Sequence, residues 1–159
     1  MELSSRGVSI HMLSYTKPRQ KISLLERNVA EVQAYVLFDN NDDQGWFLRL
    51  FTRDLFRHCK IAIRHRIDDE FEQYVLLNGT LGVLETQMVY SKEQLFSFDA
   101  TIVEVSMKVD NRPMFTPWAS CTELVKRVLC IRELMTITPY QLYVSLLNRH
   151  NGKLIKRGS

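Results

Sequence analysis

The chain has few cysteines and no long hydrophobic run, and both absences exclude classes of protein. Three cysteines among 159 residues cannot form a disulfide framework, so we expect synthesis in a reducing, cytoplasmic compartment. No apolar run approaches the roughly 20 residues of a membrane-spanning helix, so we expect no membrane span. Residues 1–19 lack the apolar core of a signal peptide, which argues against secretion by the usual route.

The spacings of common metal sites are also missing. Neither a CxxC pair nor an HExxH motif occurs, so we predict no metal site and no cofactor. The net charge is only +3, and the excess of Lys and Arg lies largely at residues 17–27 and 153–157. Such ends can contact phosphates, but no nucleic-acid-binding motif accompanies them. A solvated basic tail is the simpler interpretation, and a nucleic-acid-binding protein is the weaker alternative.

The composition is that of one globular domain, with 45% hydrophobic and 25% charged residues. We divide the chain into an arm with an amphipathic helix (1–38), an α+β domain (39–150) and a basic tail (151–159). The helix is predicted over 20–38 because apolar residues recur there three and four apart. This stripe suits packing on a partner chain. Its members are Ile22, Leu25, Val29, Val32 and Val36.

The α+β domain is expected to contain an antiparallel sheet of about four to five strands followed by a C-terminal helix pair. Strand-like segments rich in β-branched and aromatic residues alternate with turn signals, among them Asn78-Gly79. Two capping boxes, Ser120 with Glu123 and Thr138 with Gln141, predict the helix starts. The strand candidates are residues 46–51, 59–64, 71–77, 83–89 and 101–109, with a further turn at 68–70 and another at Gly82.

The predicted start of the first helix holds a candidate nucleophile. With Ser120 as N-cap, Cys121 is the first helical residue, beside unpaired backbone N–H groups and the positive end of the helix dipole. Both favour the thiolate, and the same N–H groups can stabilise an oxyanion. Cys130, at the far end of this helix, has neither advantage. The alternative is a purely structural role, in which Cys121 is an inert core residue.

A cysteine nucleophile needs a base, and His58 is the preferred candidate among the four histidines. His58 and His65 bracket a predicted strand and point to opposite faces if the strand is regular, whereas His11 and His150 lie near the chain ends. Strand alternation places His58 on the same face as Ala62, whose small side chain would let a helix approach there. A structural role for His58 is the alternative.

Three motifs occur in this order along the chain: FRHC at 56–59, CTELVKRVL at 121–129 and TPYQLY at 138–143. As a set they resemble a group of small phage-encoded proteins, over about residues 45–147. That pattern is similar to the circularly permuted branch of the papain-like thiol hydrolases, the NlpC-type and lecithin retinol acyltransferase-type proteins. In this branch the strand with the histidine precedes the helix with the cysteine.

The resemblance implies Cys121 as nucleophile, His58 as general base and a third residue on the following strand. Asn78 is the nearest polar match, since an amide oxygen can fix the imidazole tautomer. The alternative for Asn78 is a hairpin turn with Gly79. Trp118 and Trp46 flank turns and are candidates for a substrate groove. Cys130 stands where the group has a helix-ending glycine, so we expect the helix to run on to Arg132.

Two classes of function follow from these expectations. The first is a cysteine hydrolase that cleaves an amide or peptide bond, for which the resemblance suggests the peptidoglycan stem peptide. The second is a catalytically silent structural or assembly protein of a phage virion that keeps the fold and contacts other virion proteins through residues 20–38. A hydrolase carried in the virion would combine both.

Overall fold

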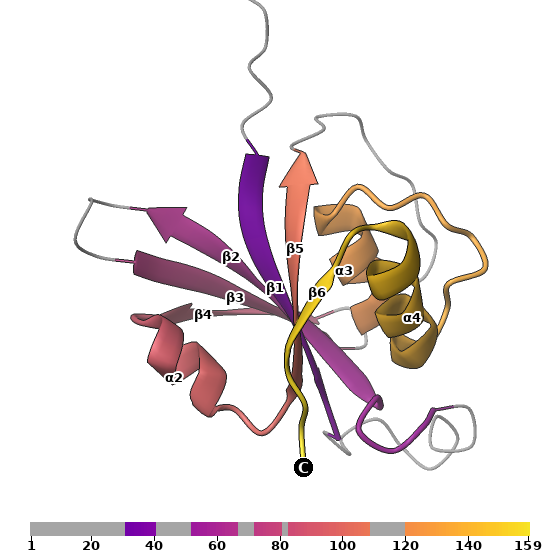
Figure 1. Ribbon diagram of the computed structural model, residues 1–159, viewed down its shortest axis with the longest axis horizontal. Helices are drawn as coiled ribbons and strands as arrows, with labels where there is room; N and C mark the ends of the chain where they lie inside the picture. The colour runs from indigo at the N-terminus through magenta and orange to yellow at the C-terminus, as the bar shows by residue number, and fades with distance from the viewer. Residues whose placement is uncertain (1–30, 41–51, 67–71, 81–82, 109–119) are drawn as a thin grey trace, which may run out of the picture.

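The structure, a computed structural model, describes residues 31–40, 52–66, 72–80, 83–108 and 120–159. Within these residues the chain forms an α+β fold in which a six-stranded antiparallel sheet carries helices on both faces (Figure 1). The predicted class is therefore confirmed, and the sheet is larger than the four to five strands expected. The candidate strand 46–51 and the candidate turns at 68–70 and Gly82 lie outside the described residues.

The sheet has the strand order β4-β3-β2-β1-β5-β6. Strand β1 lies at its centre, so Val36 is opposite Ile61 of β2 on one side and Val103 of β5 on the other. The described strands are β1 (Glu31–Asp39), β2 (His58–Arg66), β3 (Glu72–Thr80), β4 (Val83–Val89), β5 (Thr101–Lys108) and β6 (Lys153–Lys156).

The prediction of a helix through residues 31–38 is wrong, because these residues form β1. The strand is buried on both faces, so the polar–apolar alternation that normally marks a strand is missing. Val36 and Phe38 face one layer of the core while Tyr35 and Leu37 face the other. The spacing of Val32 and Val36 thus matched a helix by coincidence, and residues 20–30 lie outside the described part of the chain.

Two further local expectations are corrected. Asn78 and Gly79 do not form a turn but continue β3, where they pair with Glu85 and Leu84 of β4. The stretch predicted as a solvated basic tail contains β6, which pairs with β5 at the edge of the sheet. The Lys156 ammonium donates to the carbonyl oxygens of Phe96 and Phe98, at 3.0 and 2.7 Å, so this part of the tail is anchored.

Three helices are described, and two of them begin where the capping boxes predicted. Helix α3 (Cys121–Val128) has Ser120 as N-cap, and α4 (Pro139–Arg149) has Thr138 in a complete capping box. Helix α2 (Lys92–Ser97) was not expected, because six residues are too few to show a helical period.

Helix α3 ends at Val128 rather than running on to Arg132, so that expectation is wrong. Cys130 adopts the left-handed conformation, with φ 56°, that a glycine normally takes at this position. The N–H groups of Cys130 and Ile131 donate to the carbonyl oxygens of Arg127 and Lys126, at 3.1 and 2.8 Å. These two bonds form a Schellman motif, which satisfies carbonyls at the helix end without a glycine.

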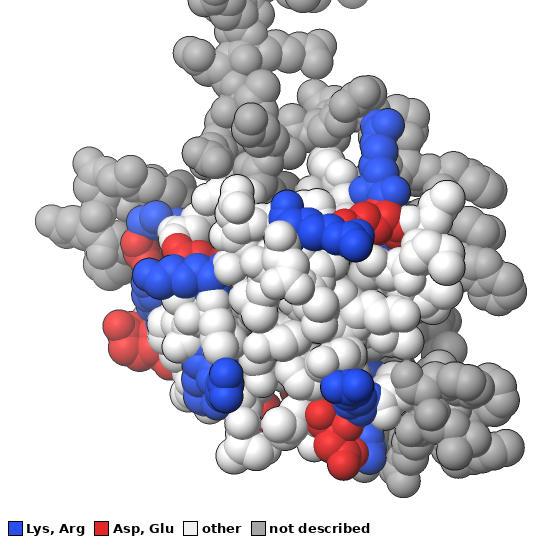
Figure 2. Space-filling view, turned by 45° about the vertical axis from the view of Figure 1, so that its right-hand side comes forward, with Lys and Arg blue, Asp and Glu red and all other residues white. Residues whose placement is uncertain are grey.

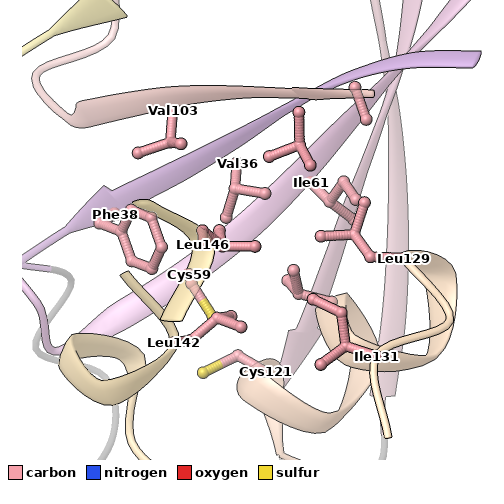
Figure 3. Packing of buried hydrophobic residues seen from close by; sticks show 13 residues of the cluster. Val36, Phe38, Cys59, Ile61, Val103, Cys121, Leu129, Ile131, Leu142 and Leu146 are labelled. Carbon is pink, nitrogen blue, oxygen red and sulfur yellow. The ribbon is translucent and has the colours of Figure 1, made fainter. Parts of the chain in front are cut away.

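The sheet separates two layers of hydrophobic core. On one face it packs against α3 and α4, and on the other against α2 (Figure 1). Figure 3 shows the first layer, in which Cys59 and Ile61 of β2 meet Cys121 of α3 and Leu142 and Leu146 of α4. The second layer consists of Tyr35, Leu37, Ala62, Tyr74, Leu76, Val89, Leu95, Ala100 and Ile102.

Candidate active site

The start of α3 places Cys121 against the sheet. The hydroxyl of Ser120 accepts a hydrogen bond from the Glu123 N–H at 3.2 Å, which fixes the first turn. Cys121 is the first helical residue and is 4% exposed. Gly79 of β3 lies beneath this helix, since a Cβ there would stand 2.8 Å from the Leu124 side chain. The missing side chain therefore lets α3 approach β3 closely.

His58 occupies the first position of β2 and is fully buried. Its imidazole hydrogen-bonds to the side chain of Cys121 and, through Nε2, to Oδ1 of Asn78 at 2.6 Å. The three side chains predicted as a catalytic set are thus linked by hydrogen bonds, with His58 between Cys121 and Asn78. Because Oδ1 can only accept, Nε2 carries the proton in this bond.

The helix does not approach on the face that the alternation suggested. Helix α3 packs over Cys59 and Ile61, whereas Ala62 faces the opposite core layer. The prediction that Ala62 makes room for the helix is therefore wrong. His58 reaches Cys121 from the end of its strand, next to the first residue of α3.

The segment that leads into β2 is anchored by an aromatic cluster. The ring centre of Phe56 lies 4.6 Å from the ring centre of Tyr143 and 5.4 Å from that of Tyr140, both on α4. It lies 5.6 Å from the ring centre of Phe38 on β1. The Arg57 N–H donates to the carbonyl oxygen of Asp39 at 3.1 Å. These contacts fix the backbone just before His58 to both the sheet and the helical layer.

The surroundings of Cys121 favour its thiolate. Its pKa is lowered from 9.0 to about 4, chiefly by a hydrogen bond from the Cys59 side chain. Burial opposes this shift, while the hydrogen bond and positive charge of His58 and the backbone N–H of Cys59 add to it. A buried thiolate is stable only with such donors and a countercharge.

The surroundings of His58 favour the imidazolium. Burial is the largest single influence and lowers its pKa, but it is outweighed by four others, so the pKa is raised above 6.5. These are the hydrogen bond and the charge of Cys121, the hydrogen bond to Asn78 and the charge of Asp39. The directions of the two pKa shifts therefore favour a thiolate–imidazolium pair, in which each charge stabilises the other.

Cys59 is a part of the site that the sequence reasoning did not single out. It is fully buried on β2, and its sulfur lies 4.0 Å from the Thr122 hydroxyl oxygen (Figure 3 shows it above Cys121). Burial raises the pKa of the Cys59 thiol well above 9.0, so it stays protonated and can donate. Its place directly after His58 in the FRHC motif was the available signal.

The two predicted groove residues are not among the described residues, and the third cysteine, which was given no role in the site, lies elsewhere. Trp46 and Trp118 lie outside the described residues. Cys130 lies at the other end of α3, away from the site. Among residues 31–40, 52–66, 72–80, 83–108 and 120–159, no group of three or more His, Cys, Asp or Glu side chains could hold a metal ion.

The charges on one face and the lengths of the described helices bear on two further kinds of site, a basic patch and a membrane span. On the face shown in Figure 2, Lys and Arg lie beside Asp and Glu around an uncharged centre, so that face has no basic patch. None of the described helices is long and apolar enough to cross a membrane.

The chain matches no protein-family model, no curated protein and no solved structure at a significant level.

Proposed function

We propose that this chain is a cysteine hydrolase-like domain that cleaves an amide or peptide bond through a thioester at Cys121. The observation that carries the proposal is the imidazole of His58, which bonds to the Cys121 thiol on one side and to Asn78 on the other. A nucleophile, a base and a residue that orients the base are the recurring parts of such sites.

The reaction would proceed in two steps. The Cys121 thiolate attacks the carbonyl carbon, and the imidazolium of His58 gives its proton to the departing amine as the C–N bond breaks. Water then attacks the thioester while His58 removes a proton, which releases the acid and restores the pair. Because Nε2 is bonded to Asn78, Nδ1 is the ring nitrogen assigned to proton exchange with the sulfur and the substrate.

The order of the parts supports the permuted papain-like arrangement as the finer description of the fold. The strand with His58 precedes the helix with Cys121, and Asn78 lies on the next strand of the sheet. The resemblance of the sequence motifs to NlpC-type proteins suggests the stem peptide of peptidoglycan as the substrate. A virion-borne role is compatible with either turnover or a silent site.

The burial of Cys121 favours a second candidate, a structural or assembly protein that retains the pair without turnover. A side chain that is 4% exposed offers a substrate little direct access in the described part of the chain. The two candidates differ in whether the sulfur can be acylated, and one experiment separates them.

The test is acylation by p-nitrophenyl acetate, followed by intact mass and peptide mapping, together with release of soluble fragments from purified peptidoglycan. We expect one acetyl group on Cys121, none on Cys121→Ser, and an unchanged result for Cys130→Ser, the matched control at the other end of α3. His58→Gln should slow acylation by roughly a hundredfold or more, and Asn78→Ala by less.

The proposed mechanism would be contradicted if Cys121 were acylated at the wild-type rate in both the His58 and the Asn78 variants. Absence of acylation in the folded wild-type chain would support the silent structural candidate instead. Circular dichroism of each variant shows whether a loss reflects chemistry or unfolding.

A further inference from the structure

We propose that Glu85 is a positioning residue that fixes where the proton of His58 lies, by holding the amide of Asn78 in one of its two orientations. The inference rests on the proposed function for its catalytic meaning, but its structural content is independent of turnover. Glu85 lies on β4, directly opposite Asn78 of β3 in the sheet register.

The hydrogen bonds around Asn78 form a chain with one direction. The Asn78 Nδ2 donates to Oε2 of Glu85 at 2.9 Å, and the Asn78 Oδ1 accepts from Nε2 of His58 at 2.6 Å. A carboxylate can accept but not donate, so it binds the NH₂ end of the amide. The oxygen end is then left for the imidazole.

An amide alone would not make this choice, since its two ends have nearly the same shape. In the reversed orientation the NH₂ group would face Nε2, which would have to accept and so lose its proton. The neutral imidazole would then carry its proton on Nδ1, where the base must instead be unprotonated. In that orientation the Nε2–H of the imidazolium would also face the NH₂ group of Asn78, and two donors facing each other disfavour the charged form.

The surroundings of Glu85 are consistent with this role. All residues of β4 except Val89 are exposed, and β4 is one of the two edge strands of the described sheet, where a charged residue is common. What distinguishes Glu85 is its bond to the amide that touches the buried His58. Gln87, two residues along and also exposed, pairs with Leu76 and provides a matched control position.

The experiment measures the tautomer of His58 directly, by ¹⁵N NMR of the imidazole in the full chain. The Cys121→Ser background is used at a pH where the imidazole is neutral, so that one ring nitrogen carries the proton. We expect the proton on Nε2 in this background and also with Gln87→Lys. With Glu85→Lys, whose ammonium donates and attracts Oδ1, the proton should shift wholly or partly to Nδ1.

Glu85→Ala, which removes the acceptor without adding a donor, should give a mixture of the two tautomers. In the chain with Cys121 intact, Glu85→Lys should slow acylation by roughly ten- to a hundredfold, the size known for partners that orient a metal-ligating imidazole. Persistence of the Nε2 proton in both Glu85 variants would overturn the inference. Because the NMR result needs no turnover, an inactive wild type would refute the proposed function without touching it.

Discussion

At the scale of single residues, the site depends on a small number of donors placed around one sulfur. The pKa of Cys121 is lowered chiefly by the hydrogen bond from the Cys59 side chain, and the hydrogen bond and charge of His58 add to this shift. Burial acts against both charges, so each partner is required. The helix start places the sulfur, but side chains and a backbone N–H from β2 supply most of its stabilisation.

A residue-scale prediction concerns the left-handed residue that ends α3. Cys130→Gly should raise the free energy of unfolding by about 0.5–1 kcal/mol, because a side chain is strained at this φ and glycine is not. Urea unfolding in the presence of a reductant measures the change. Cys130→Ala removes the thiol but keeps the strain, so it should give no stabilisation. An equal gain from both variants would contradict this explanation.

At the scale of elements, the connection between α3 and α4 is held by one carboxylate. Glu133 accepts hydrogen bonds from the hydroxyls of Thr136 and Ser145, at 2.6 and 2.7 Å, and from Nε2 of His150 at 3.1 Å. The bond from Thr136 is the largest of the influences that lower the pKa of Glu133 from 4.5 to about 2. The carboxylate therefore ties this connection to α4.

This network makes a prediction about pH. A carboxyl whose pKa is lower in the folded chain adds stability above its unfolded pKa of 4.5, and loses it as pH falls toward about 2. Glu133→Gln should therefore be less stable than wild type near pH 7, by about 1–2 kcal/mol. Thermal unfolding across the acid range should show the difference shrinking below pH 4.5. A difference that stays constant down to pH 2 would show that the charge is not involved.

The sequence predicted some elements well because their signals are local. The capping residues Ser120 and Thr138 predicted the starts of α3 and α4, alternation predicted β2, and β-branched content predicted β4. Elements whose character depends on distant partners were missed. Strand β1 lacks alternation because both its faces are covered, and Gly79 continues β3 beneath α3 instead of forming a turn with Asn78.

The candidate site was predictable to a similar extent. Cys121, His58 and Asn78 were nominated from helix capping, strand position and motif order, and the structure brings them together. Cys59 and Glu85 were not nominated, because their roles arise only when β2 meets α3 and β3 meets β4. Tertiary contact, not local sequence, decides which thiol donates and which carboxylate orients an amide.

At the scale of the whole molecule, the site lies where the sheet meets the helical layer. His58 and Asn78 come from the sheet, and Cys121 comes from the helix that packs on it (Figure 1). The aromatic cluster around Phe56 joins the same two layers close by. The pair of charges therefore exists only when the layers are docked, so its titration reports on the folded assembly of the site.

The most direct test of the whole account is the pH titration of thiolate ultraviolet absorbance in the folded chain. We expect a step at about pH 4, far below the ordinary thiol value of 9.0, that is absent in Cys121→Ser and unchanged in Cys130→Ser. His58→Gln should move this step upward, because the countercharge is lost. If Cys121 instead titrates near pH 9.0 in the wild-type chain, the thiolate–imidazolium pair does not exist, and the proposed chemistry falls with it.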